Sequence, residues 1–295
     1  MAQQELPVIG VVGLGSMGLG MAQTLAAKGF ATLGFDLSPE RKALAQKVNV
    51  TPADTLDKLF ENADFLVFSL PTARDVETVV NAHIHQLGAG RSRVVIIDTS
   101  TSEPDVSRAL AQKLDVLGHG FLDAPVSGGP AGAASGKLTM MIGGSDADLA
   151  LAQPVIETMA AKALHVGPSG AGNVAKLVNN LLAAAHMVTT SEGLKLALAA
   201  GISPESALRV LNAASGKSMI SEVHFPTWIM NDRFDSGFTM GLMRKDVRLA
   251  QELAERTGAD IPLTSVVAKL WAGSNHLEDR DDFTRMGAFQ PVSSK

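Results

Sequence analysis

Lys176 and Asn180 are the two residues of this chain whose types and spacing best suit acid–base chemistry. They lie four residues apart in the stretch Gly170 to Asn180, which opens the longest helical pattern of the sequence. On a helix, this spacing puts both side chains on one face, one turn apart. A lysine and an amide are costly to bury on an apolar helix for structure alone. Lys176 is therefore either a functional group or an edge residue whose amine reaches water.

The bulk composition is that of an ordinary globular protein. The 295 residues are 46% hydrophobic and 19% charged, which predicts one large or two medium domains with a sizeable core. The net charge of −5 comes without a long basic run, so no nucleic-acid partner is expected. The absence of cysteine excludes disulfides and thiolate metal sites.

Metal binding and membrane association are not indicated either. The seven histidines form no helical ligand pair, and we interpret His83 and His85 as solvated side chains, so no metal is expected. No apolar run reaches membrane length without polar interruption. The segment from Met1 to Pro7 lacks the charged start of a signal peptide. We expect a cytoplasmic protein that binds no membrane.

The N-terminal region carries a dinucleotide-binding pattern. The apolar run from Val8 to Val12 predicts a buried parallel strand, and a helical pattern covers 19–28. Between them stands the hexapeptide Gly13-Leu14-Gly15-Ser16-Met17-Gly18. Its first glycine suits a tight turn, its second the approach of a pyrophosphate, and its third close helix packing. The helix N-terminus then offers free N–H groups to the phosphates, although a plain glycine turn is the alternative.

The cofactor preference follows from the next strand, 32–35, which ends in Asp36. An acidic residue there is expected to bind the ribose hydroxyls and to repel a 2′-phosphate, so NAD is favoured over NADP. Arg41 and Lys42 leave room for NADP, but they follow Pro39, which should start a helix, and we interpret them as exposed.

Further strands alternate with helices and end in candidate cofactor loops. Strands over 65–69 and 94–97 lead into Leu70 and Pro71 and into 98–101. Ligands of doubly wound sheets sit beyond the carboxyl ends of strands, so both loops are expected to contact the cofactor. Ser100 and Thr101 could equally cap the helix that begins near residue 103.

The loop over 123–133 is rich in small residues and is a candidate carboxylate site. Its exposed backbone N–H groups could hold an anion, and Ser127 adds a hydroxyl. A flexible linker is the alternative, but Pro125 and Pro130 favour a fixed shape. A strand over 138–144, a helix over 146–159 and a short strand over 163–166 follow.

After Gly167 only helical patterns remain, over 172–200, 204–213, 240–257 and 263–274. The expected fold class is an α/β Rossmann-type N-terminal domain over 1–168, followed by an all-α domain over 169–295 that a long helix joins to it. By chemistry alone, Arg244, Lys245 and Asp246 are surface charges on one of these helices.

Taken in order, these motifs resemble the β-hydroxyacid dehydrogenase family over nearly the whole chain. The resemblance rests on residues 13–18, 98–101, 123–129, 132–133, 170–180 and 245–246. It implies an NAD(P)-dependent oxidoreductase that acts on a small carboxylate substrate, a 3-hydroxy acid or the matching semialdehyde. It also implies a homodimer or homotetramer whose interface the long helix supports.

The resemblance assigns roles that the residues alone leave open. It implies that Lys176 is the catalytic acid–base and Asn180 a substrate ligand, with Ser127, Gly128 and Gly129 holding the carboxylate. It implies that Thr101 and Lys245 contact the cofactor or close over the site, and that Leu70 and Pro71 line the nicotinamide side. Lys176 can act as the base only while neutral, and burial near a cationic nicotinamide is expected to lower its pKa.

Two departures and two alternatives accompany the resemblance. The turn over 215–219 lacks the aromatic residue often seen in the family, and Thr284 and Arg285 stand where simpler residues are common. An imine reductase shares the architecture, but such enzymes usually carry Asp or Tyr in place of Lys176. A non-catalytic NAD-binding protein is disfavoured because Lys176, Asn180 and Ser127 are all present.

Overall fold

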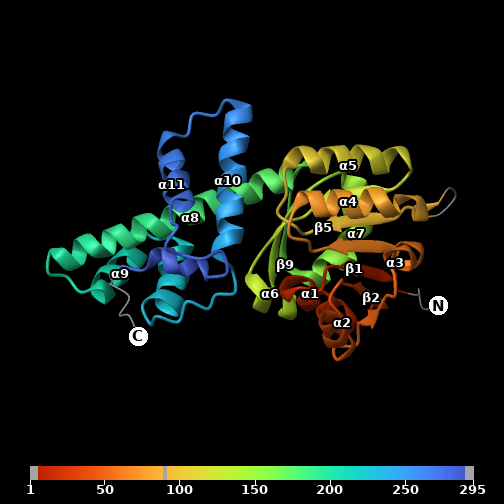
Figure 1. Ribbon diagram of the computed structural model, residues 1–295, viewed down its shortest axis with the longest axis horizontal. Coiled ribbons are helices and arrows are strands. Elements are labelled where there is room, and N and C mark those ends of the chain that lie inside the picture. The colour runs from red at the N-terminus through yellow and green to blue at the C-terminus, as the bar shows by residue number, and fades with distance from the viewer. Residues whose placement is uncertain (1–5, 89–91, 290–295) are drawn as a thin grey trace. The chain divides into compact units, whose positions relative to one another are not determined.

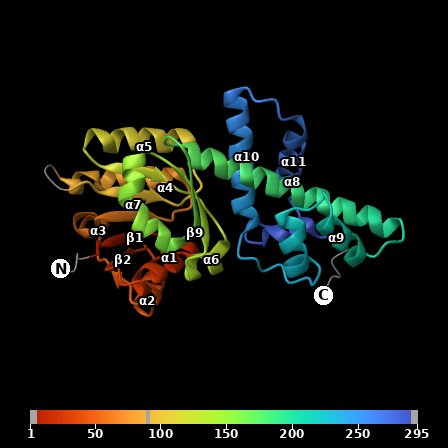
Figure 2. The ribbon, with the colours of Figure 1, turned by 180° about the vertical axis from the view of Figure 1, so that it is seen from behind.

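The structure, a computed structural model, describes residues 6–88 and 92–289. The chain forms two compact units, Met1–Lys176 and Leu177–Lys295. Figures 1 and 2 show the ribbon from opposite sides. The domain division expected after residue 168 stays a prediction, and each unit is described by itself.

The first unit is built on a largely parallel sheet with a Rossmann-type strand order. Six parallel strands run in the order β3-β2-β1-β4-β5-β6. They are β1 (Ile9–Val12), β2 (Thr32–Phe35), β3 (Thr51–Pro52), β4 (Phe65–Phe68), β5 (Val95–Asp98) and β6 (Gly120–Asp123). The chain proceeds outward from β1 to β3 on one side and from β4 to β6 on the other. The carboxyl ends of β1 and β4 therefore form the switch point where such folds bind ligands.

Three more strands extend this sheet beyond β6. The strands β7 (Val126–Ser127) and β8 (Leu138–Gly143) are antiparallel, and β9 (Ala160–Gly167) pairs in parallel with β8. The strand expected over 163–166 is thus the second half of a longer one. The two-residue strand β3 was not expected, because so short a pairing has no hydrophobic period.

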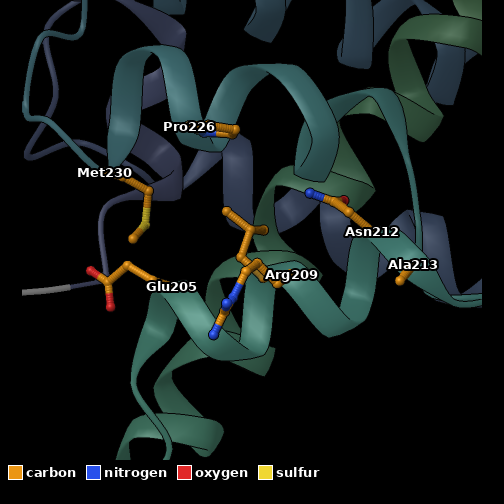
Figure 3. Close-up of a pocket in the computed structure, with 7 residues that line it drawn as sticks. Glu205, Arg209, Asn212, Ala213, Pro226 and Met230 are labelled. Carbon is orange, nitrogen blue, oxygen red and sulfur yellow. The ribbon is translucent and has the colours of Figure 1, made fainter.

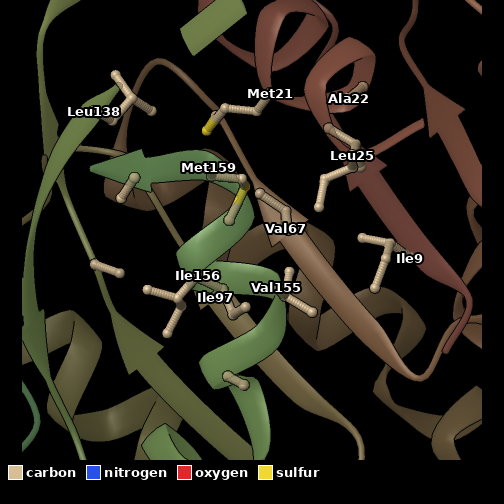
Figure 4. Packing of buried hydrophobic residues seen from close by; sticks show 14 of the residues in the cluster. Ile9, Met21, Ala22, Leu25, Val67, Ile97, Leu138, Val155, Ile156 and Met159 are labelled. Carbon is tan, nitrogen blue, oxygen red and sulfur yellow. The ribbon is translucent and has the colours of Figure 1, made fainter. Parts of the chain in front are cut away.

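Helices cover both faces of the sheet and bury two apolar cores. One face packs against α1 (Ser16–Ala27) and α7 (Asp146–Met159), where Met21, Leu25, Val155 and Met159 are buried (Figure 4). The other face packs against α3 (Leu56–Asn62), α4 (Ala73–His83) and α5 (Pro104–Val116) (Figure 1). The strands between these layers read as continuous apolar runs because both of their faces are buried.

The remaining helical segments of the first unit are short. They are α2 (Pro39–Gln46), α6 (Gly129–Ser135) and the 3₁₀ turn η1 (Ile84–Leu87). Pro39 starts α2 as expected, and Ser38 caps this helix by accepting a hydrogen bond from the Arg41 amide. Arg41 and Lys42 are partly buried rather than exposed, so that expectation is wrong.

The second unit is helical around one apolar core. The helix α8 (Ala171–Ala199) begins in the first unit and supplies Leu177, Ala184 and Met187 to this core. The other members are α9 (Pro204–Ala213), the π-helix η2 (Ile220–Ile229), α10 (Met240–Thr257), α11 (Pro262–Ala272) and the 3₁₀ turn η3 (Phe283–Gly287). The indole of Trp271 is fully buried and donates a hydrogen bond to the Ala184 carbonyl. The expected fold class, an α/β Rossmann-type region followed by an all-α region, is confirmed.

One surface expectation is wrong. The His83 ring is mostly buried, packs against Phe60 with ring centroids 5.7 Å apart, and places Nδ1 2.6 Å from the Asp57 carboxylate. Its neighbour His85 is exposed, as expected. The sequence could not reveal the difference, since both partners of His83 come from another helix. Within the described part of the chain, no helix is long and apolar enough to cross a membrane.

Candidate active site

The three glycines of the turn after β1 differ in whether the fold has space for a side chain at their positions. Gly13 has φ +89°, and an added Cβ would lie 2.3 Å from the Ser69 carbonyl oxygen. A Cβ at Gly18 would lie 1.8 Å from the Gly13 carbonyl oxygen. A Cβ at Gly15, by contrast, would meet no described atom within 4 Å. Gly13 and Gly18 are therefore demanded by packing, whereas bare backbone at Gly15 leaves room for a pyrophosphate.

The other residues of this hexapeptide have different surroundings. Leu14 is fully buried in the first core, Met17 packs partly against it, and Ser16 is exposed in the first turn of α1. Leu14 and Met17 therefore contribute packing, and Ser16 gives the first turn of α1 an exposed hydroxyl.

Asp36 directly follows β2, at the position where the sequence led us to expect a ribose-binding acid. Its carboxylate accepts hydrogen bonds from the Leu14 amide at 2.7 Å and from the Ser38 amide at 2.9 Å. The acid is thereby fixed beside the glycine-rich turn. The Lys42 amine lies over the Phe35 ring, 4.4 Å from its centroid. The donor set around this turn fits a dinucleotide, with an acidic residue at its ribose end.

The loops after β4 and β5 are tied to one another. The Leu70 amide donates a hydrogen bond to Ser100 Oγ at 3.0 Å, and the Ser100 amide donates to the Asp98 carboxylate at 3.0 Å. Pro71 is exposed and Thr101 is partly exposed. The two loops expected to contact the cofactor are thus joined at the carboxyl ends of β4 and β5.

The small-residue loop contains the short strand β7 and the helix α6. Ser127 is partly buried in the short strand β7, and Gly128 and Gly129 have φ +127° and +63°. A Cβ at Gly129 would meet no described atom within 4 Å. Only glycine adopts these angles freely, and the open space above Gly129 leaves its backbone accessible to a small anion.

The buried Asp123 anchors the helix that carries Lys176. Its carboxylate accepts hydrogen bonds from the Gly170 amide at 2.7 Å and the Asn173 amide at 2.9 Å. It therefore satisfies N–H groups that the first turn of α8 leaves without a helical partner. Burial raises the pKa of Asp123, and these amide donors oppose that rise. A Cβ at Gly172 would lie 2.3 Å from the Asp123 carbonyl oxygen, so the helix abuts the strand without clearance.

Lys176 is buried, with 7% of its surface exposed. It lies two turns into α8, and Asn180 follows one turn later with 5% exposure. Lys176 is therefore not an exposed side chain at the edge of the helix. A lysine that is almost wholly buried carries a desolvation cost that polar partners must offset.

In the second unit, Asn180 is held by an acid that we interpreted as a surface charge. Asn180 Nδ2 donates a hydrogen bond to Asp246 Oδ2 at 2.6 Å. The Lys245 amine lies 3.4 Å from Asp246 Oδ1. Asp246 is 2% exposed and the Lys245 side chain 17%, so the interpretation as surface charge is wrong for both. The buried spacing of Met243, Asp246 and Ala250 was the signal that could have identified Asp246.

Arg244 is also not a free surface charge. Its guanidinium donates to the Ser274 carbonyl at 2.6 Å, to the Leu277 carbonyl at 2.9 Å and to the Asp279 carboxylate at 2.6 Å. With 20% of its side chain exposed, Arg244 fastens α10 to the segment after α11. This role could not be predicted from the sequence, because the partners of Arg244 lie about 30 residues away.

The two segments that depart from the family pattern lie in the second unit. Met219 is 65% exposed. The Arg285 guanidinium lies 5.0 Å from the centroid of the Phe234 ring and 3.9 Å from Asp281, while Thr284 is fully buried. Arg285 thus has partners within its own unit.

Comparison with known proteins places the chain in a family. A family model described as the NAD-binding domain of 6-phosphogluconate dehydrogenase matches residues 8–167. A second, described as the NAD-binding domain of NADP-dependent 3-hydroxyisobutyrate dehydrogenase, matches residues 170–289.

Individual relatives agree with these matches. The 2-(hydroxymethyl)glutarate dehydrogenase of Eubacterium barkeri is 35% identical over 265 residues, which cover 90% of this chain and 88% of the relative. The mitochondrial 3-hydroxyisobutyrate dehydrogenase of Rattus norvegicus is 34% identical over 89% of this chain and 80% of its own length. A solved structure of Mycobacterium tuberculosis 3-hydroxyisobutyrate dehydrogenase with L-serine has a TM-score of 0.88 and 32% identity, covering 95% of this chain and 98% of that one.

The fold and these matches define the class of protein: an NAD(P)-dependent hydroxyacid dehydrogenase. The chain belongs to the β-hydroxyacid dehydrogenase family.

Proposed function

We propose that this enzyme transfers a hydride between NAD and the hydroxyl-bearing carbon of a small 3-hydroxy acid, with Lys176 as the general acid–base. The reverse reaction reduces the matching semialdehyde. The observation that carries the proposal is the burial of Lys176, 7% exposed, one helical turn before Asn180, whose amide is fixed by Asp246. A buried amine beside a fixed amide is suited to moving a proton rather than to stabilising the helix.

The side chains divide the chemistry between them. NAD, when bound, supplies the hydride acceptor. In oxidation, the neutral Lys176 amine takes the hydroxyl proton, and in reduction the ammonium returns it to the carbonyl oxygen. Asn180 uses one N–H for Asp246 and keeps the other for a substrate oxygen. The amides of Gly128 and Gly129, with the hydroxyl of Ser127, hold the substrate carboxylate.

The cofactor is assigned to the crevice at the switch point of the first unit. Open space at Gly15 suits the pyrophosphate of either cofactor, and the fixed acid at Asp36 favours NAD over NADP. Leu70 and Pro71 border the nicotinamide, while Thr101 and Lys245 contact the cofactor or close over it. In this proposal, residues 1–168 bind the cofactor and the substrate carboxylate, and residues 169–295 supply Lys176, Asn180 and the contacts between subunits.

The substrate class follows from what the relatives have in common. Their names and titles contain 3-hydroxyisobutyrate, 2-(hydroxymethyl)glutarate and L-serine. Each of these molecules has a primary hydroxyl on the carbon next to the one that bears the carboxylate. They differ in the third substituent, which is a methyl, a propionate or an ammonium group. The proposed substrate therefore contains this shared unit, HO–CH₂–CH(R)–COO⁻.

We further propose that the enzyme is a homodimer or homotetramer. The second unit exposes many large apolar side chains, among them Val178 and Leu182 on α8 and Leu196, Leu198 and Ile202 farther along the chain. A pocket between α9 and η2 (Figure 3) adds apolar lining from Leu208, Pro226 and Met230. Apolar surface of this extent is typical of subunit contacts. Sedimentation velocity at micromolar concentration tests this, and a single species of about 31 kDa would contradict it.

A panel of acids tests the proposed function. NADH or NADPH formation is measured with 3-hydroxyisobutyrate, L-serine, 2-(hydroxymethyl)glutarate, 3-hydroxypropionate, glycerate, L-threonate and 4-hydroxybutyrate, the last of which places the hydroxyl one carbon too far. Turnover of at least one 3-hydroxy acid with NAD is expected, with little turnover of 4-hydroxybutyrate. Silence on every acid, together with reduction of a cyclic imine by NADPH, would assign the chain to imine reduction. No measurable turnover of any substrate, together with tight NADH binding, would indicate a non-catalytic protein.

A further inference from the structure

Asn173 connects the helix that carries Lys176 to the loop that carries Thr101. It is fully buried, three residues before Lys176 in α8. Its side-chain Oδ1 accepts a hydrogen bond from the Ser102 amide at 2.9 Å, and its Nδ2 donates to Ser107 Oγ at 3.0 Å. One side chain thus joins the loop after β5, the first turns of α5 and the start of α8. All of these residues lie in the first unit.

The orientation of this amide is determined by its partners. The Ser102 N–H can only donate, so it needs the carbonyl oxygen of Asn173 and would oppose the NH₂ group. The Ser107 hydroxyl can accept from that NH₂ group. Asn173 therefore has a single satisfied arrangement, which suits a residue that fixes one segment relative to another.

The helix end of this connection is itself immobilised. The Asp123 carboxylate accepts hydrogen bonds from the Gly170 and Asn173 amides. A Cβ at Gly170 would lie 2.9 Å from the Pro104 carbonyl oxygen, so the start of α5 and the start of α8 are in close contact. The position of α8 on the sheet is thus set by Asp123. The loop after β5 is held to β4 through Thr99 and Ser100, and the Asn173 side chain holds its end at Ser102 to α8.

The position of Asn173 matters for catalysis because of its relation to Lys176. Residues three apart on a helix are neighbours, and helical side chains lean toward the N-terminus, so Lys176 leans over the turn that contains Asn173. The Ser102 amide that Asn173 holds is the next residue along the chain from Thr101. The side-chain amide of Asn173 therefore links the helix that carries Lys176 to the loop that carries Thr101.

We propose that Asn173 is a positioning residue that sets the distance between Lys176 and the cofactor loop at Thr101. The inference rests on the proposed function, in which the proton leaves the substrate hydroxyl and the hydride leaves the carbon that bears this hydroxyl. Both transfers need their acceptors in place at once, and a displacement of 1 Å can cost about 100-fold in rate. Asn173 itself does not touch the substrate or the cofactor in this account.

Three variants and one control test the proposal. Asn173→Ala removes both hydrogen bonds and leaves the buried Ser102 amide without its acceptor. Ser107→Ala removes only the hydrogen bond to α5 and leaves the one to the Ser102 amide. Asn173→Asp keeps the shape, because a carboxylate accepts from the Ser102 amide and the Ser107 hydroxyl can turn to donate to it. The control is His119→Ala, since the buried His119 ring likewise joins two segments, accepting from the Val94 amide and lying 2.9 Å from the Leu87 carbonyl oxygen.

The readouts separate positioning from general stability. His119 precedes β6, so it lies at the amino ends of the parallel strands, whereas Ser102 lies beyond their carboxyl ends. Asn173→Ala is expected to lower kcat by about 10- to 100-fold while the Kd of NADH changes less than threefold. Ser107→Ala should lower kcat by a few-fold, and Asn173→Asp should recover most of the loss seen with alanine. His119→Ala should lower the melting temperature at least as much as Asn173→Ala without this fall in kcat.

Amide hydrogen exchange makes the test independent of the substrate. In Asn173→Ala, the Ser102 amide should lose protection while the amides of β5 keep theirs. Equal loss of kcat in His119→Ala, or unchanged kcat in Asn173→Ala beside an active wild type, would overturn the positioning role alone. If the wild type is silent on every acid, the proposed function fails. Unchanged Ser102 exchange in the alanine variant would then overturn the positioning role as well.

Discussion

Replacing Gly15 by alanine separates the demands of the fold from those of the cofactor. Gly15 has φ −61°, an angle that any L-residue adopts, and it is the N-cap residue of α1. An added methyl would meet no described atom within 4 Å. The free protein should therefore accept alanine, whereas a bound pyrophosphate would meet a methyl in the space that glycine leaves open.

The expected magnitudes differ sharply between stability and binding. Alanine restricts the unfolded chain, which stabilises by about 0.4–1 kcal/mol, but it is a poorer N-cap than glycine by a similar amount. The free energy of unfolding should therefore stay within about 1 kcal/mol of the wild type. The Kd of NADH should rise at least ~10-fold, which corresponds to a binding loss of about 1.4 kcal/mol.

Urea unfolding and fluorescence titration with NADH measure the two quantities. Gly193→Ala is the matched control, because a Cβ at Gly193 in α8 also meets no described atom within 4 Å. The control should gain stability, since alanine replaces glycine within a helix, and should bind NADH normally. Gly18→Ala should fail to give folded protein, because its Cβ would lie 1.8 Å from a carbonyl oxygen. Normal NADH affinity in Gly15→Ala would refute the assignment of the pyrophosphate to this turn.

Three further predictions concern Asp246, Asp36 and the partly buried His224. Asp246→Ala removes the acceptor for Asn180 Nδ2 and should lower kcat by about 10- to 100-fold, whereas Asp246→Asn should lose less; steady-state kinetics checks both, and equal losses would count against the hydrogen bond. Asp36→Ser removes the charge that repels a 2′-phosphate and should shift the ratio of the NADP and NAD dissociation constants at least ~10-fold toward NADP, as measured by titration. Burial lowers the pKa of His224 below its ordinary 6.5, although Asp282 opposes the shift, so the unfolded chain binds a proton that the folded protein does not. Stability should therefore fall as the pH drops from 6.5 toward the lowered pKa. His224→Phe should flatten that fall between pH 7.5 and 5.5 in urea unfolding, and an identical pH dependence would contradict the reasoning.

The sequence predicted the sheet well where strands are buried on both faces. The runs at Phe65–Phe68 and Val95–Asp98 are almost wholly apolar and end in polar loops, so their type and direction were both legible. The short strand β3 and the π-helix η2, with Pro226 inside it, have no hydrophobic period and were not expected. Their conformations are set by neighbours rather than by local preference.

The site, like the sheet, could be predicted only where the local sequence carries the information. The glycines of the turn after β1 and the pair Lys176 and Asn180 stand out because their spacing along the chain carries the information. The partner of Asn180, Asp246, lies 66 residues away and was misjudged as a surface charge. Arg244 was misjudged for the same reason. A charged residue in a helical pattern does not reveal its tertiary partners, so the burial of Asp246 and Arg244 could be seen only in the structure.

The most direct test of the central claim is single-turnover reduction of NAD by Lys176→Ala, measured on the acid that the wild type oxidises best. Lys195→Ala is the matched control, because Lys195 is an exposed lysine on the same helix. The account predicts that Lys176→Ala binds NADH as tightly as the wild type but forms it at least ~100-fold more slowly, the share that general base catalysis contributes, while Lys195→Ala is unchanged. A Lys176→Ala rate within a few-fold of the wild type would contradict the account and remove the lysine from the mechanism.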